Sequence, residues 1–149
     1  MRWDPDAAER DTARSVTDGN SEIVRRQIDA ANRRDLDEFV ALASENVEWE
    51  DSMFWSEPTR IYRGRAELRE WVSRVLEPWE SLHFEVEEMT EAGDDLVFGG
   101  ARLTGRGKGS GVQTEIRGWF LFKVVGGEIA RRQLFLDRDE GLEAAGLGG

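Results

Sequence analysis

The feature that most constrains the fold of this chain is a change in the spacing of its apolar residues at Pro78. Before this proline the spacing is that of amphipathic helices, and after it apolar and polar residues alternate with the period of strands. We expect strands over residues 82–90, 96–104, 112–125 and 128–137, the last two joined by a tight turn at Gly126 and Gly127. The sequence therefore predicts an α+β domain in which helices come first and an antiparallel meander follows.

Three helices are expected before these strands. The first begins at Ser21, and the second begins at Asp35, whose carboxylate can cap free backbone amides while Glu38 reaches back. The third follows Gly64 and ends at Pro78, because proline cannot continue a helix. Their apolar faces consist of Ile23, Val24, Ile28 and Ala31, then Leu36, Phe39, Val40 and Ala43, then Leu68, Trp71, Val72 and Val75. The first two helices should form a hairpin.

Length and composition exclude several classes of protein. The 149 residues fit one domain, predicted over 19–149 behind a flexible amino-terminal arm at 1–18. A net charge of -11 opposes binding to nucleic acid and to anionic membranes. With no cysteine and one histidine, we expect no disulfide, no metal site and no cofactor. No secretory signal and no bilayer-spanning run are recognised, so a cytoplasmic location is expected.

A candidate catalytic group lies on the strand predicted around residues 47–51. Alternation places Val47, Trp49 and Asp51 on one face and the two intervening glutamates on the other. A carboxylate beside a large aromatic in an apolar interior is suited to proton transfer, because burial disfavours its charged form. Asp51 is therefore the candidate general base or acid. The alternative is a strand-end carboxylate that caps a loop or pairs with Arg60 or Arg132.

Other side chains are candidates for binding a ligand in the same interior. Arg132 lies two residues before Leu134 on the last predicted strand, so both side chains should point inward, and Arg132 could orient a substrate carboxylate or enolate. Gln27 could donate a hydrogen bond into the same interior from the first helix. The candidate aromatic lining consists of Trp49, Phe54, Trp55, Tyr62, Trp71, Phe98 and Phe120. The adjacent Phe54 and Trp55 lie in a predicted loop and would form a lid. The alternative is that these aromatics fill the core and leave no pocket.

An apolar surface is predicted on the other side of the sheet. The segment 118–122 is apolar on both faces, although a sheet under one helix layer needs only one apolar face. Trp119, Leu121 and Phe135 would then be exposed in a monomer, which favours a homodimer through this surface. The alternative is that the amino-terminal arm covers it.

Three segments of the chain resemble a known superfamily. Arg34–Leu42, Val47–Asp51 and Tyr62–Leu68 are similar to the SnoaL-like branch of the nuclear transport factor 2-like superfamily, and the resemblance covers about residues 20–147. It implies a cone-shaped half-barrel of antiparallel strands wrapped around three helices, enclosing an apolar pocket and usually dimerising through the sheet. Members include isomerases, cyclases, epoxide hydrolases, dehydratases and proteins without catalysis, so the fold alone assigns no activity.

Comparison with individual members of that superfamily narrows the expected activity. The resemblance places Asp51 at the position of the proton-transferring aspartate of ketosteroid isomerases. Gln27 and Gly118 stand where those enzymes have the tyrosine and the protonated aspartate that bind the oxyanion, so these two donors are missing here. We expect a protein that binds a small, largely apolar molecule, with isomerase, cyclase or hydrolase-like chemistry at Asp51. The alternative is a non-catalytic dimeric ligand-binding or interaction module.

Overall fold

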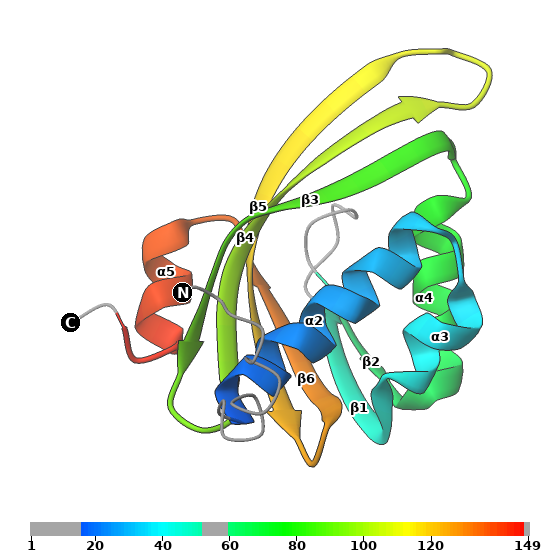
Figure 1. The fold of residues 1–149 in the computed structure, drawn as a ribbon. Coiled ribbons are helices and arrows are strands. Elements are labelled where there is room, and N and C mark those ends of the chain that lie inside the picture. The colour runs from blue at the N-terminus through cyan, green and yellow to red at the C-terminus, as the bar shows by residue number, and fades with distance from the viewer. Residues whose placement is uncertain (1–15, 52–59, 148–149) are drawn as a thin grey trace, which may run out of the picture.

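The computed structural model describes residues 16–51 and 60–147, which form one curled sheet with helices on both sides (Figure 1). The elements in chain order are α2 (Val16–Asn32), α3 (Leu36–Ala41), β1 (Ala43–Asp51), β2 (Arg60–Arg63), α4 (Gly64–Leu76), β3 (Trp79–Ala92), β4 (Leu96–Gly107), β5 (Gln113–Val125), β6 (Glu128–Phe135) and α5 (Arg138–Ala144). The predicted α+β order of helices and strands is confirmed. The predicted arm largely lies outside the described residues.

The six strands are ordered β2-β1-β6-β5-β4-β3 in the sheet. The predicted meander is correct for β3 to β6, each of which pairs antiparallel with the next. One pairing departs from the predicted half-barrel of antiparallel strands: β1 runs parallel to β6, with Trp49 opposite Arg132. Tyr62 and Arg63, predicted only as the approach to a helix, belong to the short strand β2. A four-residue edge strand is too short to show a clear period.

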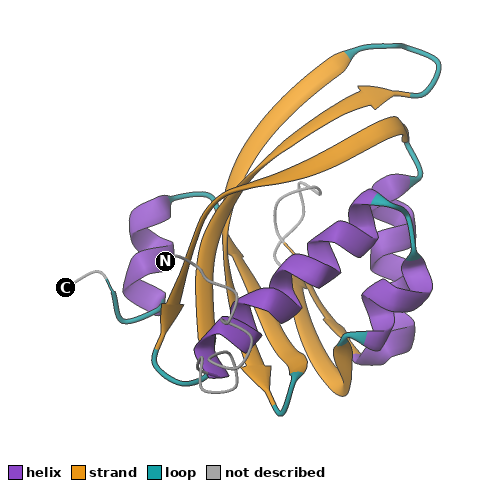
Figure 2. Cartoon of the chain, in the orientation of Figure 1, coloured by secondary structure: helices purple, strands orange, loops and turns teal. Residues whose placement is uncertain are grey.

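Helices α2, α3 and α4 cover one face of the sheet, and β3, β4 and β5 curve around α2 (Figure 2). The Asn32 side chain joins the end of α2 to β3, because Nδ2 donates to Phe84 O at 3.0 Å and Oδ1 accepts from Phe84 N at 2.8 Å. The Asp35 carboxylate caps α3 as predicted, accepting from Glu38 N at 3.1 Å. These contacts hold the helical layer over the apolar inner face of the sheet, where the main core lies.

The opposite face of the sheet is covered in part by α5, which corrects the prediction of an open apolar surface. Leu121 is buried there with Phe98, while Trp119 and Phe135 are half-buried against the same cluster. The sequence of residues 141–147 predicts a short terminal turn or helix, but α5 begins earlier, at Arg138, because Asp137, expected to end the last strand, instead caps this helix by accepting a hydrogen bond from Glu140 N. Helix α5 therefore covers part of the surface through which a homodimer was predicted to form. Homodimer formation itself stays a prediction.

The close fit of α5 depends on Gly141. A Cβ at this position would lie 2.7 Å from Cε1 of Phe98, so a larger residue would hold the helix away from the sheet. Arg138 adds two hydrogen bonds to the Glu88 carboxylate, at 2.8 and 2.9 Å, which tie the helix to β3. The outer layer is therefore attached by packing and by charge.

Candidate functional site

A cavity of about 80 Å³ lies between the helices and the inner face of the sheet. This is several times the roughly 10–15 Å³ that a single water molecule requires. Its wall is formed by Gln27, Ile28, Ala31, Phe39, Trp49, Trp71, Val72, Val75, Phe84, Ala101, Leu103, Gly118, Phe120, Phe122, Arg132 and Leu134. Apart from Gln27 and Arg132, and the indole N–H groups of the two tryptophans, these side chains are apolar. Such a lining is typical of small-molecule sites, in which a few polar groups orient an apolar ligand.

Arg132 is the charged residue of this wall. It comes from β6, where its position opposite Trp49 directs the side chain inward, and it is 5% exposed. The centre of the guanidinium lies 4.2 Å from the Trp49 ring centroid and 5.0 Å from that of Trp71. Nη1 donates a hydrogen bond of 2.8 Å to Glu50 O. The two indole rings and the backbone carbonyl therefore restrict the position of the guanidinium.

The charge of Arg132 is costly at this depth. Burial lowers the pKa of its guanidinium to about 10, and the Asp51 and Glu50 carboxylates act in the opposite direction without cancelling that effect. The group still carries its proton at pH 7. The fold therefore maintains a cation beside an apolar cavity at some cost in stability, which is an arrangement found at functional sites.

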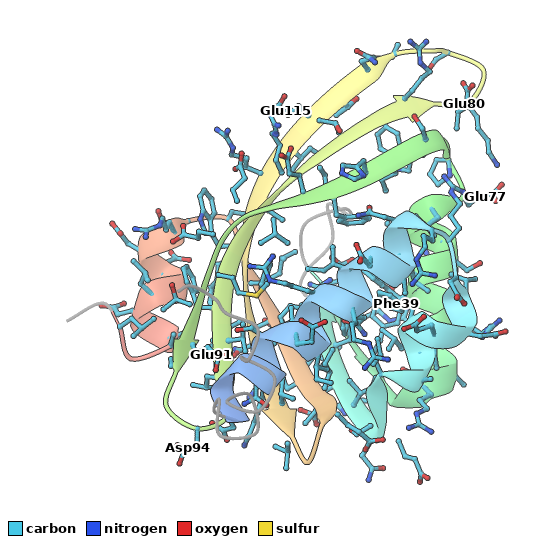
Figure 3. All side chains as sticks on the ribbon, in the orientation of Figure 1. Phe39, Glu77, Glu80, Glu91, Asp94 and Glu115 are labelled. Atoms are coloured by element: carbon cyan, nitrogen blue, oxygen red, sulfur yellow. The ribbon has the colours of Figure 1, made fainter. Side chains whose placement is uncertain are left out.

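Aromatic rings form most of the wall near Arg132. The Trp49 and Trp71 centroids are 5.2 Å apart, and Phe39 lies 5.6 Å from Trp49 with its ring tilted by 64°. Phe39, labelled in Figure 3, comes from α3, and its ring centroid lies 6.4 Å from that of Trp71 on α4. The indole Nε1 atoms of Trp49 and Trp71 are buried and have no acceptor among the described residues. Buried donors without acceptors cost free energy, so this end of the site is short of hydrogen-bond acceptors.

Gln27 is the second polar residue of the wall and is 1% exposed. Its Nε2 donates to Phe39 O at 3.2 Å, a contact that links α2 to α3. The bond fixes the amide at the cavity wall, where its carbonyl oxygen provides an acceptor.

The structure places Asp51 close to the cavity but not in its wall. Asp51 is buried, at 1% exposure, on the same face of β1 as Trp49, and it ends the strand opposite Arg60 of β2. The residues that line the cavity include Trp49 but not Asp51. Its carboxylate therefore lies beyond the apolar wall while acting electrostatically on Arg132.

Two predicted lining residues lie elsewhere, which corrects those predictions. Phe98 points to the other face of the sheet and packs with Leu121 beneath α5. Tyr62 is buried in the main core on the edge strand β2, with Arg60 4.2 Å above its ring, and does not reach the cavity. Phe54 and Trp55 lie outside the described residues. Trp49, Trp71, Phe120, Gln27 and Arg132 do line the cavity.

Several wall residues were not among the predicted site residues, namely Phe39, Phe84, Phe122 and Leu134. The sequence pattern does mark all four as facing the core, by the alternation of residues along a strand or by the spacing of residues along a helix. This pattern distinguishes buried from exposed positions, but it does not distinguish residues that line a cavity from residues that fill the core.

Comparison with known proteins assigns the family. Residues 24–132 match the family model described as SnoaL-like domain. The chain belongs to this SnoaL-like family. A search of curated protein sequences found no match.

Solved structures of similar fold come from several bacteria. One is a hypothetical protein with a ketosteroid isomerase-like fold from Catenulispora acidiphila, in complex with trimethylamine (22% identity, 85% of this chain and 93% of that chain, TM-score 0.69). A second is a putative SnoaL-like polyketide cyclase from Jannaschia sp. CCS1 (23%, 80% and 86%, TM-score 0.68). A third is Rv0760c from Mycobacterium tuberculosis, in complex with estradiol-17β-hemisuccinate (17%, 81% and 95%, TM-score 0.70). At these identities the likeness establishes the fold of the SnoaL-like protein and no activity.

Two further classes of site were searched for in the part of the chain that the structure describes. It contains no group of three or more acidic or histidine side chains placed to hold a metal ion. None of its helices has both the length and the apolar character needed to cross a bilayer.

Proposed function

We propose that this SnoaL-like protein binds a small, largely apolar molecule in the cavity between its helices and its sheet. The observation that carries the proposal is an apolar cavity wall interrupted by the polar side chains Gln27 and Arg132. The family supports it, since the related Rv0760c was solved with estradiol-17β-hemisuccinate and the Catenulispora protein with trimethylamine. The small cavity volume favours ligands of a few heavy atoms or the narrow end of a larger molecule.

The first prediction is that small cyclic and aliphatic compounds raise the midpoint of thermal unfolding. A ligand at 100 times its Kd stabilises the folded state by about 2.7 kcal/mol, which corresponds to a shift of roughly 5 °C or more for a chain of this length. The measurement is a thermal-shift screen, followed by titration of the intrinsic tryptophan fluorescence, to which Trp49 and Trp71 of the cavity wall contribute.

The matched control is Ala101→Leu, which adds volume to the cavity wall without removing a polar group. We expect this variant to lose the ligand-induced shift. An equal shift in both proteins would mean that the compounds bind elsewhere, and the absence of any shift across the screen would contradict the proposal.

A second candidate function adds proton transfer by Asp51. It is supported by the burial of this carboxylate next to the cavity and by its influence on Arg132. Because the carboxylate lies behind the wall, the proposed transfer requires a ligand that extends past Trp49 toward the end of β1. The alternative is a binding module that performs no chemistry.

The second prediction concerns Asp51→Asn, which keeps the shape of the side chain and removes its ability to accept a proton at neutral pH. For a bound compound with an acidic C–H group, we expect wild type to catalyse hydrogen–deuterium exchange, and the variant to be slower by about 10² to 10⁴-fold. NMR of the ligand in D₂O measures the exchange, and the thermal shift measures binding separately. Equal exchange rates in the two proteins would remove Asp51 from the chemistry and leave the binding proposal intact.

A further inference from the structure

We infer that Arg132 makes the cavity selective for molecules in which an apolar body carries a carboxylate. This inference rests on the proposed binding function and names the chemical class of its ligand. The starting observation is a buried cation whose side chain forms part of a wall that is otherwise almost entirely apolar.

Most of the hydrogen-bonding capacity of Arg132 is unused within the described residues. A guanidinium has five N–H donors in a planar fork. The hydrogen bond that the structure shows for it is the one from Nη1 to Glu50 O. Its central carbon also lies 4.2 Å from the Trp49 ring centroid and 5.0 Å from that of Trp71, which are contacts with the π systems of the indoles and supply no lone-pair acceptor. The remaining donors belong to a side chain that lines the cavity, and a planar fork of N–H groups is what a carboxylate can accept in a bidentate manner.

Arg132 also differs from three arginines on the outer side of the sheet in how its charge is balanced. Arg102, Arg117 and Arg138 all form ion pairs on the surface, with glutamates of β3 at 2.6 to 2.9 Å. No ion pair within 4.0 Å involves Arg132 among the described residues, and the carboxylates of Asp51 and Glu50 act on it from farther away. A buried cation without a contacting anion gains more from an incoming anion than a surface cation does, because little water screens the interaction.

The acceptors that the site lacks are those that a carboxylate supplies. The Nε1 atoms of Trp49 and Trp71, which belong to the same aromatic cluster, have no acceptor among the described residues. The Arg132 guanidinium is likewise a group of donors only. A neutral amide would offer it one oxygen, but would also bring an N–H₂ group toward the cation. A ligand carboxylate has only acceptors, so it matches the donors of Arg132.

The net charge of the chain does not contradict this selectivity. The total of -11 repels anions at long range, which slows their approach. That field is screened over about 8–10 Å at moderate ionic strength, whereas the contact with Arg132 is made inside the protein. The local cation therefore decides the preference once the ligand is bound.

The third prediction compares acids with amides of the same shape. The probes are benzoate with benzamide, hexanoate with hexanamide, and cyclohexanecarboxylate with cyclohexanecarboxamide, at pH 7.5 and constant ionic strength. Dissociation constants come from titrations followed by ¹H–¹⁵N NMR, in which the indole resonances of Trp49 and Trp71 report occupancy of the cavity. We expect the acid of at least one pair to bind about 10-fold more tightly than its amide, or better, because hydrogen bonds to charged groups are the stronger ones.

The variants assign the preference to one side chain. Arg132→Met keeps an unbranched apolar side chain in the wall and should abolish the preference for the acid. Arg131→Met is the matched control, since Arg131 is the neighbouring residue on β6 and is exposed, and it should keep the preference. Arg132→Lys retains a charge without the planar fork and should keep only part of the preference, which provides a second readout if Arg132→Met folds poorly.

Each outcome separates this inference from the function on which it rests. If amides bind in the cavity as tightly as acids, or if Arg132→Met keeps the preference, the cavity binds ligands without reading their charge and the inference is wrong. If neither acids nor amides shift the indole resonances, the proposed binding of small molecules fails together with it.

Discussion

Replacing Trp49 by alanine is expected to lower the free energy of unfolding by about 3–5 kcal/mol, as for other large aromatic-to-alanine changes in cores. Trp49 is 3% exposed and joins three parts of the site. Its ring centroid lies 5.2 Å from that of Trp71 on α4 and 5.8 Å from that of Phe122 on β5, and Arg132 stacks on it. The variant loses these contacts and leaves an enlarged cavity that the surrounding β-strands cannot close.

Urea-induced unfolding measures this loss, and Trp119→Ala is the control. Trp119 is also a strand tryptophan, but it is half-buried on the outer face beside α5. We expect the control to cost less than half as much as Trp49→Ala. Losses of equal size would mean that the aromatic cluster around the cavity contributes no more to stability than the outer layer does.

The order of elements could be predicted because its signals are local. The Asp35 cap, the helical spacing up to Pro78 and the glycine pair at Gly126 each depend on a few neighbouring residues. Parity along single strands likewise placed Trp49 and Arg132 on the inner face. The parallel pairing of β1 with β6 could not be predicted in this way, since it joins segments about 80 residues apart.

The errors at the site arise where both faces of a strand are apolar. In β4, Phe98 and Val97 point to opposite faces and both are fully buried, so the pattern alone does not indicate which face carries the cavity. The structure decides it, because α5 covers the face of Phe98. Asp51 was predicted to point inward, and the structure shows it buried. It does not line the cavity, because the alternation of residues along a strand indicates the face of a side chain but not how far along the strand the cavity extends.

The shape of the cavity depends on a position that sequence analysis did not single out. Gly99 on β4 pairs with Phe120 on β5, and the Phe120 ring lies over the glycine where a side chain would otherwise stand. A Cβ at Gly99 would be 2.6 Å from Cζ of Phe120 and 2.7 Å from the backbone oxygen of Glu88. The absence of a side chain therefore allows Phe120 to form the cavity wall while β3 stays close to β4.

Gly99→Val is accordingly expected to destabilise the protein by about 3 kcal/mol, at the upper end of the usual cost of overpacking, because the Glu88 backbone oxygen cannot move aside without disturbing the β3–β4 pairing. The displaced Phe120 ring should also enter the cavity and weaken ligand binding. Urea unfolding and the thermal-shift screen measure the two effects. Gly100→Ala is the control: on the outer face, its Cβ would lie 2.9 Å from the half-buried Trp119 ring and 3.7 Å from Oε1 of Glu88, and it would meet no backbone atom within 3 Å. We expect the control to cost less and to leave ligand binding unchanged, since Trp119 can turn toward solvent. Weakened binding in the control, or unchanged binding in Gly99→Val, would contradict the role assigned to Phe120.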